Sequence, residues 1–92
     1  MKPTIKVFYF PHGVLTLNSE FFPCTKKTFK GIYNIAVMST DEDEVTQNID
    51  NLIYLLEERA DTFDYHKDQK GIKKVGDLFN YLQELRIKDG RL

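Results

Sequence analysis

Apolar residues recur every three or four positions through the middle of the chain, which is the spacing of one helix face. The pattern predicts a long helix over about residues 41–63. Ser39 or Thr40 can cap its start, and the carboxylates of Asp41–Glu44 then interact favourably with the positive N-terminal end of the helix dipole. The apolar face consists of Val45, Ile49, Leu52, Ile53, Leu56, Ala60 and Phe63.

Two shorter segments show the same spacing. The first predicts a helix over about residues 25–38 that Thr25 caps, although residues 32–38 also have the composition of a third strand. The second predicts a helix over about residues 73–88 that ends at Gly90, after a polar loop at residues 65–71. Their apolar positions are Phe29, Ile32, Tyr33 and Ala36 in the first, and Ile72, Val75, Phe79 and Leu82, flanked by Leu78 and Leu85, in the second.

The N-terminal segment has the composition of strands instead. Residues 5–10 are rich in β-branched and aromatic side chains, and both faces of this strand carry apolar residues, so we expect both to be partly covered. Pro11 suits the first central position of a type I turn, and Gly13 suits the left-handed position of a three-residue loop. A returning strand then completes a β-hairpin over about residues 4–17.

These elements predict an α+β fold in which the N-terminal hairpin packs against two or three α-helices. A two-stranded hairpin is marginally stable by itself, so the helices must cover it. Phe21 and Phe22, in the connection after the hairpin, are expected to fill the base of the core. We expect residues 1–92 to form a single small domain whose modest core holds no large ligand cavity.

The formal net charge of −1 conceals a strong asymmetry along the chain. Residues 41–64 carry nine acidic residues and one basic residue. Residues 1–40 carry five lysines and one glutamate, and residues 65–92 carry seven basic and four acidic residues. Such a separation of charge affects association and the steering of charged partners rather than the fold.

Most of the acidic residues of the long helix project from the side opposite its apolar face. Basic residues at the i+4 positions, which would offset them, are missing, and the single Arg59 projects near the apolar face instead. A solvated helix face is one explanation. The other is a contact surface for a basic partner, with a tyrosine as its aromatic anchor. The candidate partner-binding residues are Asp43, Asp50, Tyr54, Glu57, Glu58 and Asp61.

The sequence contains no catalytic, cofactor or metal motif. Cys24 is the single cysteine, and nothing in the spacing links it to His12 or His66. One cysteine and two scattered histidines give no zinc pattern, and the acidic run at residues 41–44 lacks the alternating ligands and glycine of a calcium loop. We therefore expect a non-enzymatic protein without cofactor or bound metal.

Direct nucleic-acid binding is the alternative function. Lys6, Lys26, Lys27 and Lys30 can form a basic patch on the hairpin and the first helix, but the sequence pI of about 6.1 is far from the basic character of most such proteins. The separated charges also allow a homodimer in which acidic and basic segments of two copies meet. No apolar run can span a bilayer and no signal peptide is recognisable, so with its unpaired cysteine the protein is expected in the cytoplasm.

A compact chain with a lysine-bearing hairpin, an acidic helix and no catalytic motif resembles the accessory proteins of phages and mobile elements, and in particular the anti-CRISPR inhibitors. The resemblance covers size, charge layout and fold style, and it includes no signature motif. It implies an inhibitor that uses an acidic surface to occupy the nucleic-acid groove of a CRISPR nuclease in the host cytoplasm. The nearly balanced net charge departs from the strongly acidic members of that group.

Overall fold

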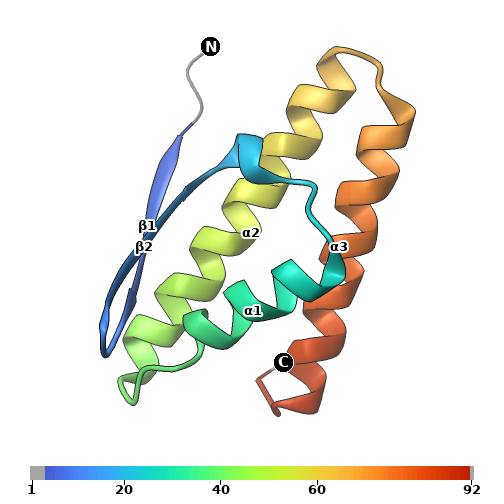
Figure 1. Ribbon diagram of the computed structural model, residues 1–92. Helices are drawn as coiled ribbons and strands as arrows, with labels where there is room; N and C mark the ends of the chain where they lie inside the picture. The colour runs from blue at the N-terminus through green and yellow to red at the C-terminus, as the bar shows by residue number, and fades with distance from the viewer. Residues whose placement is uncertain (1–3, 92) are drawn as a thin grey trace.

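The computed structural model describes residues 4–91 and has the predicted α+β architecture (Figure 1). A β-hairpin lies at one side of the long central helix, a second long helix lies at the other side, and a short helix crosses between them. In chain order the elements are β1 (Ile5–Phe10), β2 (Gly13–Asn18), a 3-10 turn η1 (Ser19–Phe21), α1 (Lys26–Ala36), α2 (Glu42–Tyr65) and α3 (Gln69–Lys88).

The hairpin is confirmed, but its turn is shorter than predicted. Phe10 pairs with Gly13, so the loop contains only Pro11 and His12 rather than three residues. Gly13 has a φ of +153°, a conformation that L side chains rarely adopt, and this explains the glycine after the turn. Pairing continues to Ile5 opposite Asn18, so the second strand ends at residue 18.

The core lies where the inner face of the hairpin meets the three helices. The two hairpin faces are covered to different extents, because Phe8 on the inner face is fully buried, whereas on the outer face Val7 is partly buried and Ile5, Tyr9 and Val14 are exposed. The main cluster contains Phe8, Phe22, Phe29, Ile32, Tyr33, Ala36, Leu52, Leu55, Leu56, Val75, Leu78, Leu82 and Leu85.

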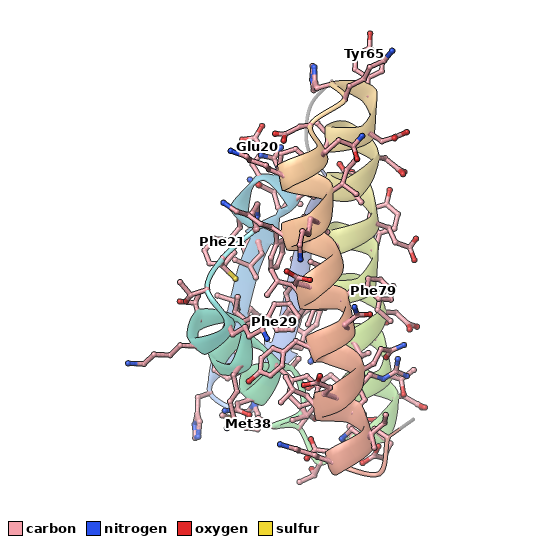
Figure 2. The ribbon with its side chains drawn as sticks, turned by 90° about the vertical axis from the view of Figure 1, so that its right-hand side faces the viewer. Glu20, Phe21, Phe29, Met38, Tyr65 and Phe79 are labelled. Atoms are coloured by element: carbon pink, nitrogen blue, oxygen red, sulfur yellow. The ribbon has the colours of Figure 1, made fainter. Side chains whose placement is uncertain are left out.

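The first helix is confirmed, and the alternative of a third strand at residues 32–38 is wrong. Thr25 caps it as predicted, because its side chain accepts a hydrogen bond from the Thr28 amide. The helix ends at Ala36, two residues earlier than predicted. All four predicted apolar positions are buried, and Figure 2 shows one of them, Phe29, in the interior between α1 and α3.

The predicted filling of the base of the core is half right. Phe22 is buried and packs edge-on against Phe29, with ring centroids 6.1 Å apart. Phe21 remains 41% exposed, so it covers the core only in part.

The predicted caps of the long helix are wrong, because Asp41 rather than Ser39 or Thr40 accepts hydrogen bonds from the first amides of α2.

The predicted polar loop at residues 65–71 is wrong, since only residues 66–68 separate α2 from α3. Lys67 adopts a left-handed conformation, with a φ of 55°, and the Asp68 amide donates to the Phe63 carbonyl at 2.8 Å. Asp68 then caps α3 by accepting from the Gly71 amide at 3.0 Å. The third helix therefore begins about one turn earlier than predicted, at Gln69.

The predicted end of the third helix at Gly90 is confirmed. Gly90 has a φ of +66°, and the Arg91 amide donates to the Arg86 carbonyl at 2.8 Å, which closes the helix in a Schellman motif. At the other end of the molecule, Figure 2 shows Tyr65 at the tip where α2 and α3 meet, and this side chain is 83% exposed.

Candidate functional site: an acidic face of the second helix

Four carboxylates lie along one exposed face of α2, and we call Asp43, Asp50, Glu57 and Asp61 the acidic ridge. All four side chains belong to exposed residues. Positions 43, 50, 57 and 61 fall within about 40° of one another around the helix, and 18 steps of 1.5 Å give the ridge a length of about 27 Å. Within residues 4–91, the ion pairs that form involve none of these four carboxylates.

The ridge faces outward because the opposite side of α2 is fixed in the core. Leu52, Leu55 and Leu56 are fully buried there. Arg59, the one basic residue of α2, is held on the core side as well. Its Nε donates to the Phe22 carbonyl at 2.8 Å and its guanidinium lies 4.3 Å from the centroid of the Phe63 ring. Arg59 is therefore engaged elsewhere and does not neutralise the ridge.

The predicted aromatic anchor, Tyr54, lies in the middle of the ridge but is not free. The ring is 46% exposed, and the Lys6 ammonium from β1 stands 4.4 Å from its centroid. The helix sequence shows no basic residue at the i+4 positions, but the fold brings Lys6 from β1 to the acidic face at this point. Lys6 forms no ion pair within 4.0 Å with the described carboxylates, so it offsets the ridge's field only locally.

Glu58 does not belong to the ridge, although its sequence position suggested that it would. It is half-buried, and its Oε1 accepts hydrogen bonds from the Thr4 amide at 3.0 Å and from the Ser19 hydroxyl at 3.5 Å. This carboxylate ties the start of the hairpin and the following turn to α2. Glu58 is therefore a structural residue that is turned toward its own chain rather than toward a partner.

The lysines of the alternative basic patch lie on different elements. Lys6 is half-buried against α2, as described above. Lys26, Lys27 and Lys30 are exposed on α1, and the Lys26 ammonium lies 5.4 Å from the centroid of the Tyr81 ring on α3. Lys6 and Lys26 thus contact different long helices.

An open groove of about 370 Å³ adjoins the acidic ridge where the start of α2 meets the end of α3. Asp50 lines it together with Arg86 and Arg91. Arg91 also forms an ion pair with Glu42 at 3.1 Å, which joins the two helix ends. Because the groove contains both arginines and carboxylates, it does not simply extend the acidic surface.

The single cysteine and the two histidines lie on separate parts of the fold. Cys24 is partly buried, and burial raises the pKa of its thiol, which disfavours the reactive thiolate. His12 lies in the hairpin turn and His66 at the C-terminal end of α2, on elements other than the segment that carries Cys24. Among residues 4–91, no group of three or more His, Cys, Asp or Glu side chains is placed to hold a metal ion.

None of the helices in the described part of the chain has the length and hydropathy needed to cross a membrane. Comparisons of the chain with protein-family models, with curated proteins and with solved structures found no match. The functional proposal therefore rests on the surface itself.

Sequence reasoning missed the polar residues by which α2 holds the hairpin. Asn48 is fully buried, and its side chain hydrogen-bonds to the backbones of Tyr9 and Ala36. The Asn51 amide donates to the Val7 carbonyl at 3.2 Å. The sequence contained one signal of this role. Asn48 directly precedes Ile49 and falls among the apolar positions of the helix, where a polar side chain is buried and needs a hydrogen-bond partner.

Proposed function

We propose that this protein is a non-enzymatic interaction module whose acidic ridge docks on the basic, nucleic-acid-binding surface of a partner protein and blocks it. The observation that carries the proposal is the row of exposed carboxylates that this chain leaves without ion-pair partners among its described residues. Surfaces that bind nucleic acid are lined with lysine and arginine, so they offer the complementary charge.

The spacing of the charges favours docking by charge complementarity over imitation of a nucleic-acid duplex. B-DNA carries one charge per 1.7 Å of axis, or about 16 charges over the about 27 Å that the ridge covers. The ridge has four. A partner therefore recognises a few spaced carboxylates on a rigid helix, and the affinity should fall steeply as salt screens them.

A CRISPR nuclease is the partner class that we propose for this surface. Such enzymes hold their guide–target duplex in a positively charged channel. They operate in the host cytoplasm, a reducing compartment that suits a chain with one unpaired cysteine. Occupation of that channel by the ridge would prevent target DNA from binding, so the expected phenotype is loss of DNA cleavage.

The direct test compares two doubly substituted proteins. Asp50→Lys/Glu57→Lys reverses two ridge charges, and Glu20→Lys/Glu84→Lys makes the same change in net charge at exposed acids elsewhere. We expect the unsubstituted protein and the control pair to inhibit plasmid cleavage by a Cas9–guide RNA complex and to bind it at low salt. The ridge pair should lose at least tenfold in affinity.

If the nuclease tested is not the natural target, affinity capture from a nuclease-treated lysate of the host extends the test. Proteins that are retained by the unsubstituted protein and the control pair, but released by the ridge pair, identify the partner. Capture of the same proteins in equal amounts by all three would contradict docking through the ridge.

Lys6→Gln distinguishes this function from direct nucleic-acid binding. If the ridge docks on a basic surface, removal of the Lys6 charge beside Tyr54 should tighten binding to the partner. If Lys6, Lys26, Lys27 and Lys30 bind nucleic acid instead, the same substitution should weaken binding to labelled DNA or RNA and reduce its salt dependence. The two functions thus predict opposite outcomes for one variant.

A further inference from the structure

The outer edge of β1 is hydrogen-bonded to side chains of α2, whereas within the described residues the outer edge of β2 is open. On β1, Asn48 Oδ1 accepts from the Tyr9 amide at 3.0 Å and Asn48 Nδ2 donates to the Tyr9 carbonyl at 2.7 Å. Asn51 satisfies the Val7 carbonyl on the same edge. Side chains of α2 therefore occupy the edge of β1 as a neighbouring strand would.

The hydrogen-bonding direction of β2 follows from this contact. Since the backbone groups of Tyr9 face α2, its partner Val14 belongs to a pair without mutual hydrogen bonds, and the groups of Val14 must face away from β1. By the same alternation Thr16, which pairs with Val7, also directs its amide and carbonyl outward. Among residues 4–91, no hydrogen bond reaches these outward groups.

The edge of β2 also lacks the features with which proteins usually protect an open strand. Natural edges carry charged side chains, prolines or bulges, or they are covered by another element. The strand Gly13–Asn18 contains neither a charged residue nor a proline, and its pairing with β1 is regular. Figure 1 shows the helices on one side of the hairpin, and α1 and α2 contact chiefly β1 rather than β2.

The exposed face of the hairpin is uncharged as well. Ile5 is 61% exposed, Tyr9 49% and Val14 58%, and Thr16 lies beside them on β2. In a chain in which 29% of residues are charged, an uncharged face next to an unprotected edge indicates a surface that is covered in the functional protein.

We propose that the occupant of this edge is a second copy of the same chain, whose β2 pairs antiparallel with the first across a two-fold axis at Thr16. The four strands then form one antiparallel sheet. Thr16 lies opposite Thr16 of the second copy, and each Val14 lies opposite an Asn18. These are the positions whose backbone groups point outward, so each finds a partner.

The side chains fit this register without conflict. With the axis at Thr16, Leu15 of one copy stands opposite Leu17 of the other on the inner face, and both leucines are only partly buried in the single chain. Cross-strand apolar pairs of this kind stabilise a sheet. Like charges do not meet along β2, and a net charge of −1 per chain gives little repulsion between copies.

The proposed dimer is independent of the proposed function. The ridge lies on α2, beyond β1, and thus on the side of the hairpin away from the axis. Pairing of two short edges covers less than the standard interface of about 1,600 Å², so we expect a dissociation constant in roughly the micromolar range.

The test is sedimentation velocity of the full chain from about 0.5 μM to about 500 μM, which brackets a dissociation constant in the micromolar range. Thr16→Lys places two lysines side by side at the axis and should keep the protein monomeric. Ile5→Lys adds the same charge to the same sheet face, but on β1, and should leave dimerisation unchanged. The charge-reversed ridge pair should also dimerise normally.

Amide exchange of the unsubstituted protein gives a second readout that needs no variant. The amides of Leu15 and Leu17 are bonded to β1 and should be protected at every concentration, whereas those of Val14 and Thr16 should become protected only as the dimer forms. A protein that stays monomeric throughout, or whose dimer is weakened equally by Ile5→Lys and Thr16→Lys, would overturn the proposal. Protection of Val14 and Thr16 only in the presence of another protein would overturn it as well.

Discussion

Asn48 on α2 binds the backbone of Tyr9 on β1 through both atoms of its carboxamide, 39 residues away along the chain. The same Nδ2 also donates to the Ala36 carbonyl at the end of α1, at 3.0 Å. One fully buried side chain thus joins the hairpin to two helices and satisfies three backbone groups, of which the Ala36 carbonyl is buried and the two of Tyr9 are partly buried.

Asn48→Ala should destabilise the protein by about 2–4 kcal/mol, because it leaves the buried Ala36 carbonyl and the partly buried amide and carbonyl of Tyr9 without these partners. Asn51→Ala is the matched control, since Asn51 is half-buried and makes one bond of 3.2 Å, and it should cost about 1 kcal/mol or less. Urea denaturation monitored by circular dichroism measures both. Equal losses in the two variants would show that the contact of Asn48 has no special importance.

Gly71→Ala should destabilise the protein by about 1–3 kcal/mol, because a Cβ at residue 71 would lie 2.5 Å from the Phe63 ring, where α3 closely approaches α2. Gly76 lies in the same helix, and a Cβ added there would meet no atom within 4 Å. Gly76→Ala should therefore raise stability by up to about 1 kcal/mol through helix propensity alone. Opposite shifts in thermal midpoint are expected, and stabilisation by both substitutions would contradict the close approach.

Tyr33 makes stability depend on alkaline pH. Burial, together with its 2.8 Å hydrogen bond to Asp89, raises the pKa of Tyr33 to about 12. The unfolded chain loses this proton near pH 10 while the folded chain keeps it, so the contribution of Tyr33 is complete below about pH 10 and is lost as pH rises toward 12.

Tyr33→Phe should cost about 1 kcal/mol at neutral pH, and the deficit should shrink as pH rises above about 10. Denaturant titrations at several alkaline pH values measure it. Tyr65→Phe removes an equivalent phenol that is 83% exposed, so it should leave the pH dependence unchanged. A constant deficit for Tyr33→Phe across that range would argue against the raised pKa.

Glu57 and Glu58 are neighbours with different roles, and alanine should separate them. Glu58→Ala removes the acceptor for the Thr4 amide and the buried Ser19 hydroxyl, and should cost about 1–2 kcal/mol of stability. Glu57→Ala should change stability by no more than about 0.5 kcal/mol, since its side chain is exposed. In partner binding the order should reverse, with Glu57→Ala the weaker binder. Equal stability of the two variants would show that the hydrogen bonds of Glu58 do not stabilise the fold.

The periodic apolar pattern was sufficient to predict the second and third helices, because their positions depend on local spacing. Strand composition and turn residues predicted the hairpin, whereas the first helix was predicted with a strand at residues 32–38 left open as the alternative. The start of α3 was not predictable in the same way. Lys67 takes the left-handed position that glycine or asparagine usually occupies, so the turn carried no recognisable signal. Asp68 then had the appearance of one more polar loop residue rather than a cap.

The candidate site was predictable only as far as helix geometry determines it. The ridge positions follow from 3.6 residues per turn, and the structure leaves Asp43, Asp50, Glu57 and Asp61 exposed. The structural role of Glu58 and the position of Lys6 over Tyr54 depend on contacts between α2 and a strand about 50 residues earlier. Spacing along one helix contains no information about such contacts.

The attachment of α2 to the hairpin edge also determines how the carboxylates are displayed. A synthetic peptide of Glu42–Tyr65 would lack the contacts that Arg59 and Asn48 make with the rest of the protein. Its like charges at helical spacing would oppose helix formation. In the intact protein the entropy cost of ordering the helix is already part of folding, so a partner binds a preorganised helix. Grafting this helix onto another scaffold would therefore require equivalents of the Asn48 hydrogen bonds that hold it.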